Sequence, residues 1–244
     1  MKAIEVKNLY KVFSSLVQGQ APVVALDDVS LSVEEGSLTV IGGANGSGKS
    51  VLMSIIAALQ KPSDGTCTSL SKPGLVFQDA ASQILGDTPR DDIAVGPRNQ
   101  KVNKKEIPLI VEKALAQTNL SEKADWPALF LSGGEKRRLA VASILAMQKD
   151  IIIFDEPYAN LDYPGVCDLN ALIQKLHENK KTILLLTHEI EKCLGLADQF
   201  VILHKGKIVF DGKPQDALNQ PLESWGIKNP LSSYKVLKDL VWQS

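Results

Sequence analysis

The sequence has few cysteines, no long hydrophobic run and no excess of charge of either sign. Its 244 residues include three cysteines, Cys67, Cys167 and Cys193, which are odd in number and widely spaced. This pattern excludes a disulfide framework and a clustered cysteine metal site, and it favours a reducing compartment. The apolar stretches are far shorter than the roughly 20 residues that a membrane-spanning helix needs. We also expect no secretory signal, because the first residues lack its apolar core.

The charges nearly cancel, because 27 Lys and Arg residues oppose 28 Asp and Glu residues. This balance gives no overall attraction to nucleic acid or to an anionic membrane surface. Hydrophobic residues make up 44% of the chain and charged residues 23%, as in ordinary globular proteins. The length predicts one or two domains, at about 150 residues per domain, with enough chain for a sizeable core.

Short apolar segments alternate with helical patterns along the chain. Alternating residues at 4–8 and 29–33 predict a small antiparallel sheet near the N-terminus. The order strand, helix, strand, in which the strands are continuous apolar runs, predicts a mostly parallel sheet covered on both faces. The chain is therefore expected to be an α/β protein. Expected strands lie at 23–26, 38–41, 74–77, 151–154, 182–187, 200–204 and 207–211, and expected helices at 49–59, 103–118, 132–147 and 166–177.

Two regions differ from this α/β pattern. Residues 79–146 contain helical patterns and no clear strand, so we interpret them as a helical insertion. From residue 214 the chain is interrupted by Pro and Asn and ends in a short apolar helical pattern. This tail contains Trp225, Val236, Leu237, Leu240, Val241 and Trp242, and we expect it to pack on its own chain, with contact to a partner subunit as the alternative.

A glycine-rich loop is the strongest chemical signal. Residues 43–50 read GANGSGKS and match the phosphate-loop pattern G-x-x-x-x-G-K-[ST]. Glycines let the backbone amides point at an anion, and the following helix directs its positive end there. Lys49 is expected to contact the β- and γ-phosphates of a nucleotide, and Ser50 to hold Mg²⁺. The residues expected to line the nucleotide are Gly43, Ala44, Asn45, Gly46, Ser47, Gly48, Lys49, Ser50 and Val51.

Two further strands end in groups suited to the same site. The apolar run 151–154 is followed by Asp155 and Glu156, and the run 183–186 by Thr187 and His188. Because the carboxyl ends of parallel strands converge, these side chains are expected beside the phosphate loop. We assign Asp155 to Mg²⁺ through water, Glu156 to polarising the attacking water and His188 to the γ-phosphate.

The segment Leu131-Ser132-Gly133-Gly134-Glu135 narrows the interpretation. Its Ser-x-x-Glu spacing is a helix capping box, yet two glycines in a first helical turn cost stability. The segment resembles the LSGGQ signature of the ATP-binding cassette (ABC) family, with Glu135 at the last position as a known kind of variation.

The order of motifs extends the resemblance over residues 3–213. The family's motifs appear in their usual order: Walker A at residues 43–50, the Q-loop at Gln78, the signature at 131–135, Walker B at 155–156, the D-loop at 160–162 and the H-loop at His188. The resemblance implies that Gln78 takes part in catalysis and Mg²⁺ binding. It also places Phe13 on the adenine ring, with Tyr10 as the alternative. It implies a single ABC ATPase domain over 1–244, with an α/β core (1–78 and 147–213), a helical subdomain (79–146) and a tail (214–244).

A narrower resemblance lies in residues 74–85 and 91–97. They look like the ATPases of energy-coupling-factor and cobalt-type importers, whose second glutamine helix, here around Gln83, meets a membrane coupling subunit. This implies transport of a vitamin or a transition-metal ion, ATP and Mg²⁺ as cofactors, a membrane partner at 78–97 and a place at the cytoplasmic face of the membrane. No nucleic acid partner is expected.

The family resemblance further implies a head-to-tail dimer that holds two ATP molecules. Each ATP would lie between the phosphate loop of one subunit and Ser132, Gly133, Gly134 and Glu135 of the other, which is a second copy or a paralogue. The alternatives are an ATPase of a conventional ABC transporter, a soluble ABC ATPase without a transport role, and a nucleotide-binding regulator without turnover.

Two positions depart from the family pattern. Val51 stands where many members have Thr, which removes one hydrogen bond to the α-phosphate and weakens binding by about 0.5–1.5 kcal/mol. Glu135 adds a negative charge near the partner's nucleotide, and Lys136, Arg137 and Arg138 are candidates to compensate it.

Overall fold

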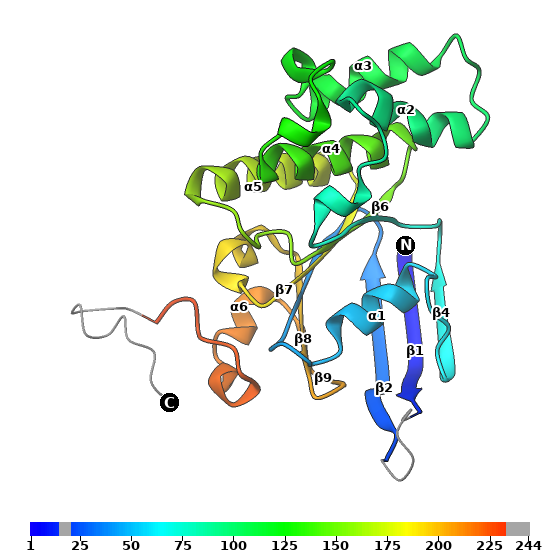
Figure 1. Cartoon of the computed structure of the whole chain (residues 1–244). Coiled ribbons are helices and arrows are strands. Elements are labelled where there is room, and N and C mark those ends of the chain that lie inside the picture. The colour runs from blue at the N-terminus through cyan, green and yellow to red at the C-terminus, as the bar shows by residue number, and fades with distance from the viewer. Residues whose placement is uncertain (15–20, 233–244) are drawn as a thin grey trace.

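A six-stranded sheet forms the centre of the protein in the computed structural model, which describes residues 1–14 and 21–232 (Figure 1). Its first five strands are parallel, and the last runs antiparallel to its neighbour. The strand order is β5 (Gly74–Val76), β6 (Ile151–Asp155), β7 (Thr182–Thr187), β3 (Leu38–Gly42), β8 (Gln199–His204) and β9 (Lys207–Gly212). Every residue of β3, β6 and β7 is buried, as expected for continuous apolar strands covered on both faces.

Alternate side chains of these strands enter two different cores. On β6, Ile151 and Ile153 pack against α1 (Lys49–Ile56), whereas Ile152 and Phe154 pack against α5 (Tyr163–Glu178). This division follows from the period of two along a strand. The predicted α/β architecture is therefore confirmed, with α1 against one face of the sheet and α5 and part of α4 against the other.

The second sheet is antiparallel and closes the α1 core from the other side. Its order is β2 (Val23–Glu34), β1 (Lys2–Phe13) and β4 (Asp64–Ser69). The expected sheet is confirmed, but β1 and β2 pair well beyond the apolar alternation, as far as Phe13 opposite Val23. The sequence pattern missed β4, because DGTCTS has no apolar alternation and its first residues are typical of a turn. The expectation that 23–26 is buried is wrong for Val23 and Val24, which are exposed.

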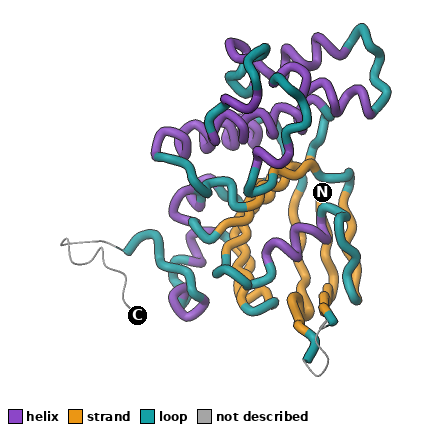
Figure 2. The backbone as a smooth tube through the Cα atoms, viewed as in Figure 1, coloured by secondary structure: helices purple, strands orange, loops and turns teal. Residues whose placement is uncertain are grey.

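Helices gather at one end of the molecule, beyond the sheets (Figure 2). They are α2 (Pro89–Asn99), α3 (Ile107–Gln117) and α4 (Gly133–Ala146), and they share a separate apolar core. The predicted helices at 103–118 and 132–147 correspond to α3 and α4. The helix α2 was not predicted, because Gly96 and Pro97 lie inside it and disfavour helix.

Short helices complete the described chain. They are η1 (Ala80–Gln83), η2 (Ser121–Lys123), η3 (Ala128–Phe130), η4 (Ile190–Lys192), η5 (Leu194–Leu196), α6 (Pro214–Ala217) and η6 (Leu222–Trp225). Trp225 packs against the α5 side of the core, as expected of the tail. The other tail residues named above lie outside the described residues; they are Val236, Leu237, Leu240, Val241 and Trp242. Within residues 1–14 and 21–232, none of the helices has the length and apolarity required for a membrane span.

A buried carboxylate joins the helices to the segment that precedes them. Asp92 of α2 is 5% exposed. Its Oδ1 accepts hydrogen bonds from the amides of Leu85 (2.6 Å) and Gly86 (3.0 Å), and its Oδ2 accepts one from Ser143 Oγ of α4 (2.8 Å). One side chain therefore holds the 85–86 turn, α2 and α4 together.

Replacing this carboxylate is expected to destabilise the fold. Asp92→Ala leaves buried donors without an acceptor, which costs about 1–3 kcal/mol. The neighbouring Asp91→Ala is a matched control, because Asp91 is exposed and its loss costs less than about 1 kcal/mol. Chemical denaturation of both variants measures the difference, and equal unfolding free energies would contradict the role of Asp92.

Candidate nucleotide site

A cleft of 480 Å³ opens where β3, β6 and β7 end. The carboxyl edge of a parallel sheet is where such folds bind ligands. The lining residues are Val23, Val24, Ala25, Asn45, Gly46, Ser47, Gly48, Lys49, Ser50, Val51, Gln78, Glu156 and His188. The structure therefore brings together the phosphate loop and three of the side chains that the sequence motifs singled out.

The glycine-rich loop packs against neighbouring backbone atoms, which leaves no room for a side chain at two of its positions. Gly43 and Gly48 have φ angles of 155° and 107°. A Cβ atom would lie 2.3 Å from the Leu203 carbonyl oxygen at Gly43, and 2.6 Å from the Ala25 carbonyl oxygen at Gly48. No side chain is tolerated at such distances, so only glycine permits this loop between β3 and α1.

Lys49 lies under the loop at the start of α1. It is 5% exposed, and its Nζ donates hydrogen bonds to the carbonyl oxygens of Gly43 (2.7 Å) and Ala44 (3.3 Å). The same ammonium lies 3.4 Å from Glu156 Oε1. A buried cation thus faces the loop interior, where the phosphates of a nucleotide would lie.

Glu156 links Lys49 to His188. Its Oε2 accepts a hydrogen bond from the His188 amide (3.2 Å) and lies 2.9 Å from His188 Nδ1. The Glu156 backbone has a positive φ of 45°, and its amide donates to the Leu186 carbonyl oxygen at the end of β7. The carboxylate is therefore held between a cation and an imidazole in the lining of the cleft.

Asp155 is the group best suited to a divalent cation. It is 8% exposed, and its Oδ1 is buried without a hydrogen-bond partner. Burial raises the pKa of Asp155, the charge of Glu156 raises it further, and Lys49 opposes both. An unpartnered carboxylate oxygen is a ligand that Mg²⁺ prefers, directly or through water. Asp155, with the Ser50 hydroxyl and the Gln78 amide of the adjoining cleft, thus forms a donor set that fits Mg²⁺.

The structure places Phe13 beside the cleft rather than in its lining. Phe13 is 37% exposed and pairs with Val23 across the β1–β2 ladder, and Lys11 Nζ lies 5.1 Å from its ring centroid. Val23 and Val24 line the cleft with exposures of 62% and 53%. The sequence interpretation missed them, because an apolar run alone does not distinguish a buried strand end from an exposed one.

The signature residues lie outside the cleft of their own chain. Ser132 and Gly133 are exposed, and Ser132 caps α4. Ser132 Oγ accepts from the Glu135 amide (3.2 Å), and Glu135 Oε2 accepts from the Ser132 amide (2.9 Å). The predicted capping box is therefore present.

The charge of Glu135 has a partner that the sequence did not indicate. Lys123 Nζ lies 2.6 Å from Glu135 Oε1, so Lys123 occupies the compensating position considered for Lys136, Arg137 and Arg138. Burial opposes ionisation of Glu135, but the Lys123 ammonium and the Ser132 amide outweigh it and hold the pKa of Glu135 below its usual range.

Gln83 has a structural task in the fold. Its side-chain amide donates to the Leu75 carbonyl oxygen (2.8 Å) and accepts from the Phe77 amide (2.8 Å). Because β5 is an edge strand, this pairing substitutes for a further strand. Gln83 thereby fixes the segment that leads from β5 to Gln78.

The sequence matches a known family model and curated relatives. A model described as "ABC transporter" matches residues 26–159. The energy-coupling factor transporter ATP-binding protein EcfA of Carboxydothermus hydrogenoformans is 38% identical, over 85% of this chain and 82% of that protein. The protein of the same kind named EcfA2 of Methanospirillum hungatei is 33% identical over 89% of this chain, and the match spans 63% of that protein.

Solved structures share the fold. The structure of cbiO1 from Clostridium perfringens, described as part of the ABC transporter complex cbiONQ, matches with a TM-score of 0.80 and 28% identity, over 90% of this chain and 91% of that one. The dimeric ATP-binding cassette MJ0796 bound to ADP and Pi matches with a TM-score of 0.76 and 27% identity, over 86% and 98%. Together with the phosphate loop and its cleft, these matches show that the chain belongs to the ABC transporter family and is one of its nucleotide-binding ATPases.

Proposed function

We propose that this chain is the ATP-hydrolysing subunit of an energy-coupling-factor-type importer, which moves a vitamin or a transition-metal ion. The observation that carries the hydrolytic part is the contact of Glu156 with both Lys49 and His188 in the cleft beside the phosphate loop. The transport part is supported by the names of the relatives, which are ATP-binding proteins of energy-coupling factor transporters.

Each group in the cleft has a chemical task in this proposal. Lys49 and the amides of residues 43–50 bind the β- and γ-phosphates of ATP. Asp155, Ser50 and Gln78 hold Mg²⁺, which when bound neutralises charge on those phosphates. Glu156 polarises the attacking water as general base, a contribution of about 10²–10⁴ in rate. His188 keeps Glu156 in place and faces the γ-phosphate.

The chain works as a head-to-tail dimer with two ATP molecules at the interface. Ser132 and Gly133 are exposed at the N-terminus of α4, and they do not line the cleft of their own chain. Free amides at a helix start bind anions, so the ATP of a second subunit is a suitable ligand. The dimeric cassette bound to ADP and Pi supports this arrangement.

A membrane coupling subunit contacts the region 78–97, at the cytoplasmic face of the membrane. A groove of 380 Å³ beside this region has an apolar lining that includes Leu75, Val95 and Met147. Leu85 at its rim is 77% exposed. An apolar groove with a polar rim is typical of a protein interface.

The first test removes the proposed general base. Glu156→Gln keeps the shape of the side chain but cannot take a proton, so ATP turnover should fall by about 10²–10⁴ while ATP binding persists. ATP-bound dimers should accumulate in size-exclusion chromatography. Glu191→Gln, at an exposed carboxylate of η4, is the control and should turn over normally. Unchanged phosphate release by Glu156→Gln would exclude Glu156 as the base.

The second test separates the dimer interface from the stability of the chain. A Cβ at Gly133 would have nothing within 4 Å, so Gly133→Gln should keep or raise the melting temperature. In the dimer the same side chain would lie against the partner's ATP. Turnover should therefore fall at least about tenfold, which corresponds to an activation free energy higher by about 1.4 kcal/mol. Gly195→Gln, where a Cβ also has nothing within 4 Å, is the matched control. Full activity of Gly133→Gln would argue against the interface.

The third test identifies the partners. We expect affinity purification from native membranes, followed by mass spectrometry, to recover a coupling subunit and a small integral substrate-binding protein. Recovery of a conventional permease would overturn the energy-coupling-factor assignment, and recovery of soluble partners alone would overturn the transport role.

A further inference from the structure

The guanidinium of Arg137 is buried between α4 and two loops of the nucleotide cleft. Arg137 is 5% exposed. Its Nη2 donates a hydrogen bond to the Gln78 carbonyl oxygen (2.8 Å), and its Nη1 a longer one to the Ala159 carbonyl oxygen (3.4 Å). The buried Nε has no hydrogen-bond partner.

This cation is held by backbone carbonyls rather than by a carboxylate. Within the part of the chain that the structure describes, no acidic group forms an ion pair with Arg137. Burial lowers the pKa of Arg137, and the charge of Asp79 opposes this effect. An apolar side chain of similar length would fill the same space without the cost of desolvating a charge. The two hydrogen bonds are therefore the feature that an apolar side chain could not supply.

The two carbonyl groups belong to loops that carry proposed catalytic groups. Gln78 itself lines the cleft. Ala159 closes a turn in which its amide donates to the Glu156 carbonyl oxygen (3.3 Å). One guanidinium on the signature helix thus connects the Gln78 loop with the turn that follows Glu156.

We propose that Arg137 is a positioning residue for ATP hydrolysis, which fixes the backbones of Gln78 and of the turn after Glu156 relative to α4. The proposal rests on the roles given above to Gln78 and Glu156. A displacement of about 1 Å at a reacting group can cost about 10² in rate. The phosphate contacts of residues 43–50 do not involve Arg137, so its loss should lower kcat and leave the KM for ATP nearly unchanged.

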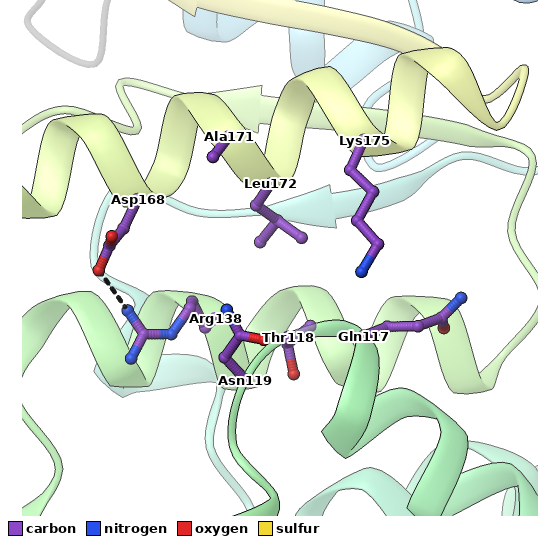
Figure 3. Close-up of a pocket in the computed structure, with 8 residues that line it drawn as sticks. All are labelled: Gln117, Thr118, Asn119, Arg138, Asp168, Ala171, Leu172 and Lys175. Atoms are coloured by element: carbon purple, nitrogen blue, oxygen red, sulfur yellow. Dashed lines mark hydrogen bonds and ion pairs between the residues drawn. The ribbon is translucent and has the colours of Figure 1, made fainter.

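The neighbouring arginine provides a matched control. Arg138 lies on the same helix but points into a cleft of 180 Å³ between α3, α4 and α5, where its Nη1 lies 3.4 Å from Asp168 Oδ2 (Figure 3). Lys175 reaches into the same cleft from α5 (Figure 3). Arg138 therefore matches Arg137 in charge, length and helix, but its hydrogen bond goes to α5.

The test compares Arg137→Met, Arg137→Lys and Arg138→Met in the full chain, in the assembly in which it is purified. Steady-state phosphate release gives kcat and KM, and ATP binding and thermal melting confirm that each variant is folded. We expect the kcat of Arg137→Met to fall at least about tenfold with KM within about threefold. Lysine keeps the charge and one hydrogen bond, so Arg137→Lys should have an intermediate kcat. Arg138→Met should keep both constants within about twofold.

Each outcome bears on the proposal in a defined way. A wild-type kcat in Arg137→Met, or equal losses in Arg137→Met and Arg138→Met, would overturn it. If Arg137→Met does not bind ATP or melts without a transition, the Arg137→Lys variant is used as the test instead. A kcat of Arg137→Lys within about twofold of wild type would then overturn the proposal. The Glu156→Gln variant in the same assay tests the function by itself: retained turnover there contradicts the role of Glu156, whatever the arginine variants show.

Discussion

The central sheet has to be covered on both faces, and the rest of the molecule depends on this requirement. Its strands β3, β6 and β7 are fully buried, so they offer no polar side chain to solvent along their length. Two cores result, one closed by α1 with the antiparallel sheet and one closed by α5. Polar side chains that can reach a ligand therefore lie where the strands end, and the nucleotide cleft forms at this edge.

The parts of the site that follow directly after a buried strand could be predicted from the sequence. The loop at 43–50 follows β3, Glu156 follows β6 and His188 follows β7. Each is specified by a local pattern, in which an apolar run is followed by glycines, by an acid or by an imidazole. Parallel pairing of the strands then brings these residues together. The fold class could be predicted for the same reason, because the apolar runs themselves specify buried strands.

The features that could not be predicted depend on partners distant in sequence. The strand β4 exists because it pairs with β1, and its own residues have no apolar alternation. The charge of Glu135 is balanced by Lys123 and not by the three basic residues that follow it. Gln83 lies in the segment that the motif assigned to a membrane partner, but its side-chain amide forms hydrogen bonds with the backbone along the edge of β5. In each case a single side chain or strand could take several partners, and only the assembled fold selects one.

The helix α4 shows why the helical region and the cleft are mechanically connected. Its Leu139 and Ala142 belong to the core of the helical region, whereas Val141 and Ile144 belong to the core behind the central sheet. A helix that is buried on both sides cannot slide without disturbing two close-packed interiors, which resist small deformations. Relative motion of the helical region must therefore be taken up by the connecting loops. Arg137 lies where α4 meets two of those loops, so it is at this boundary, rather than in either core, that a single side chain can govern the geometry of hydrolysis.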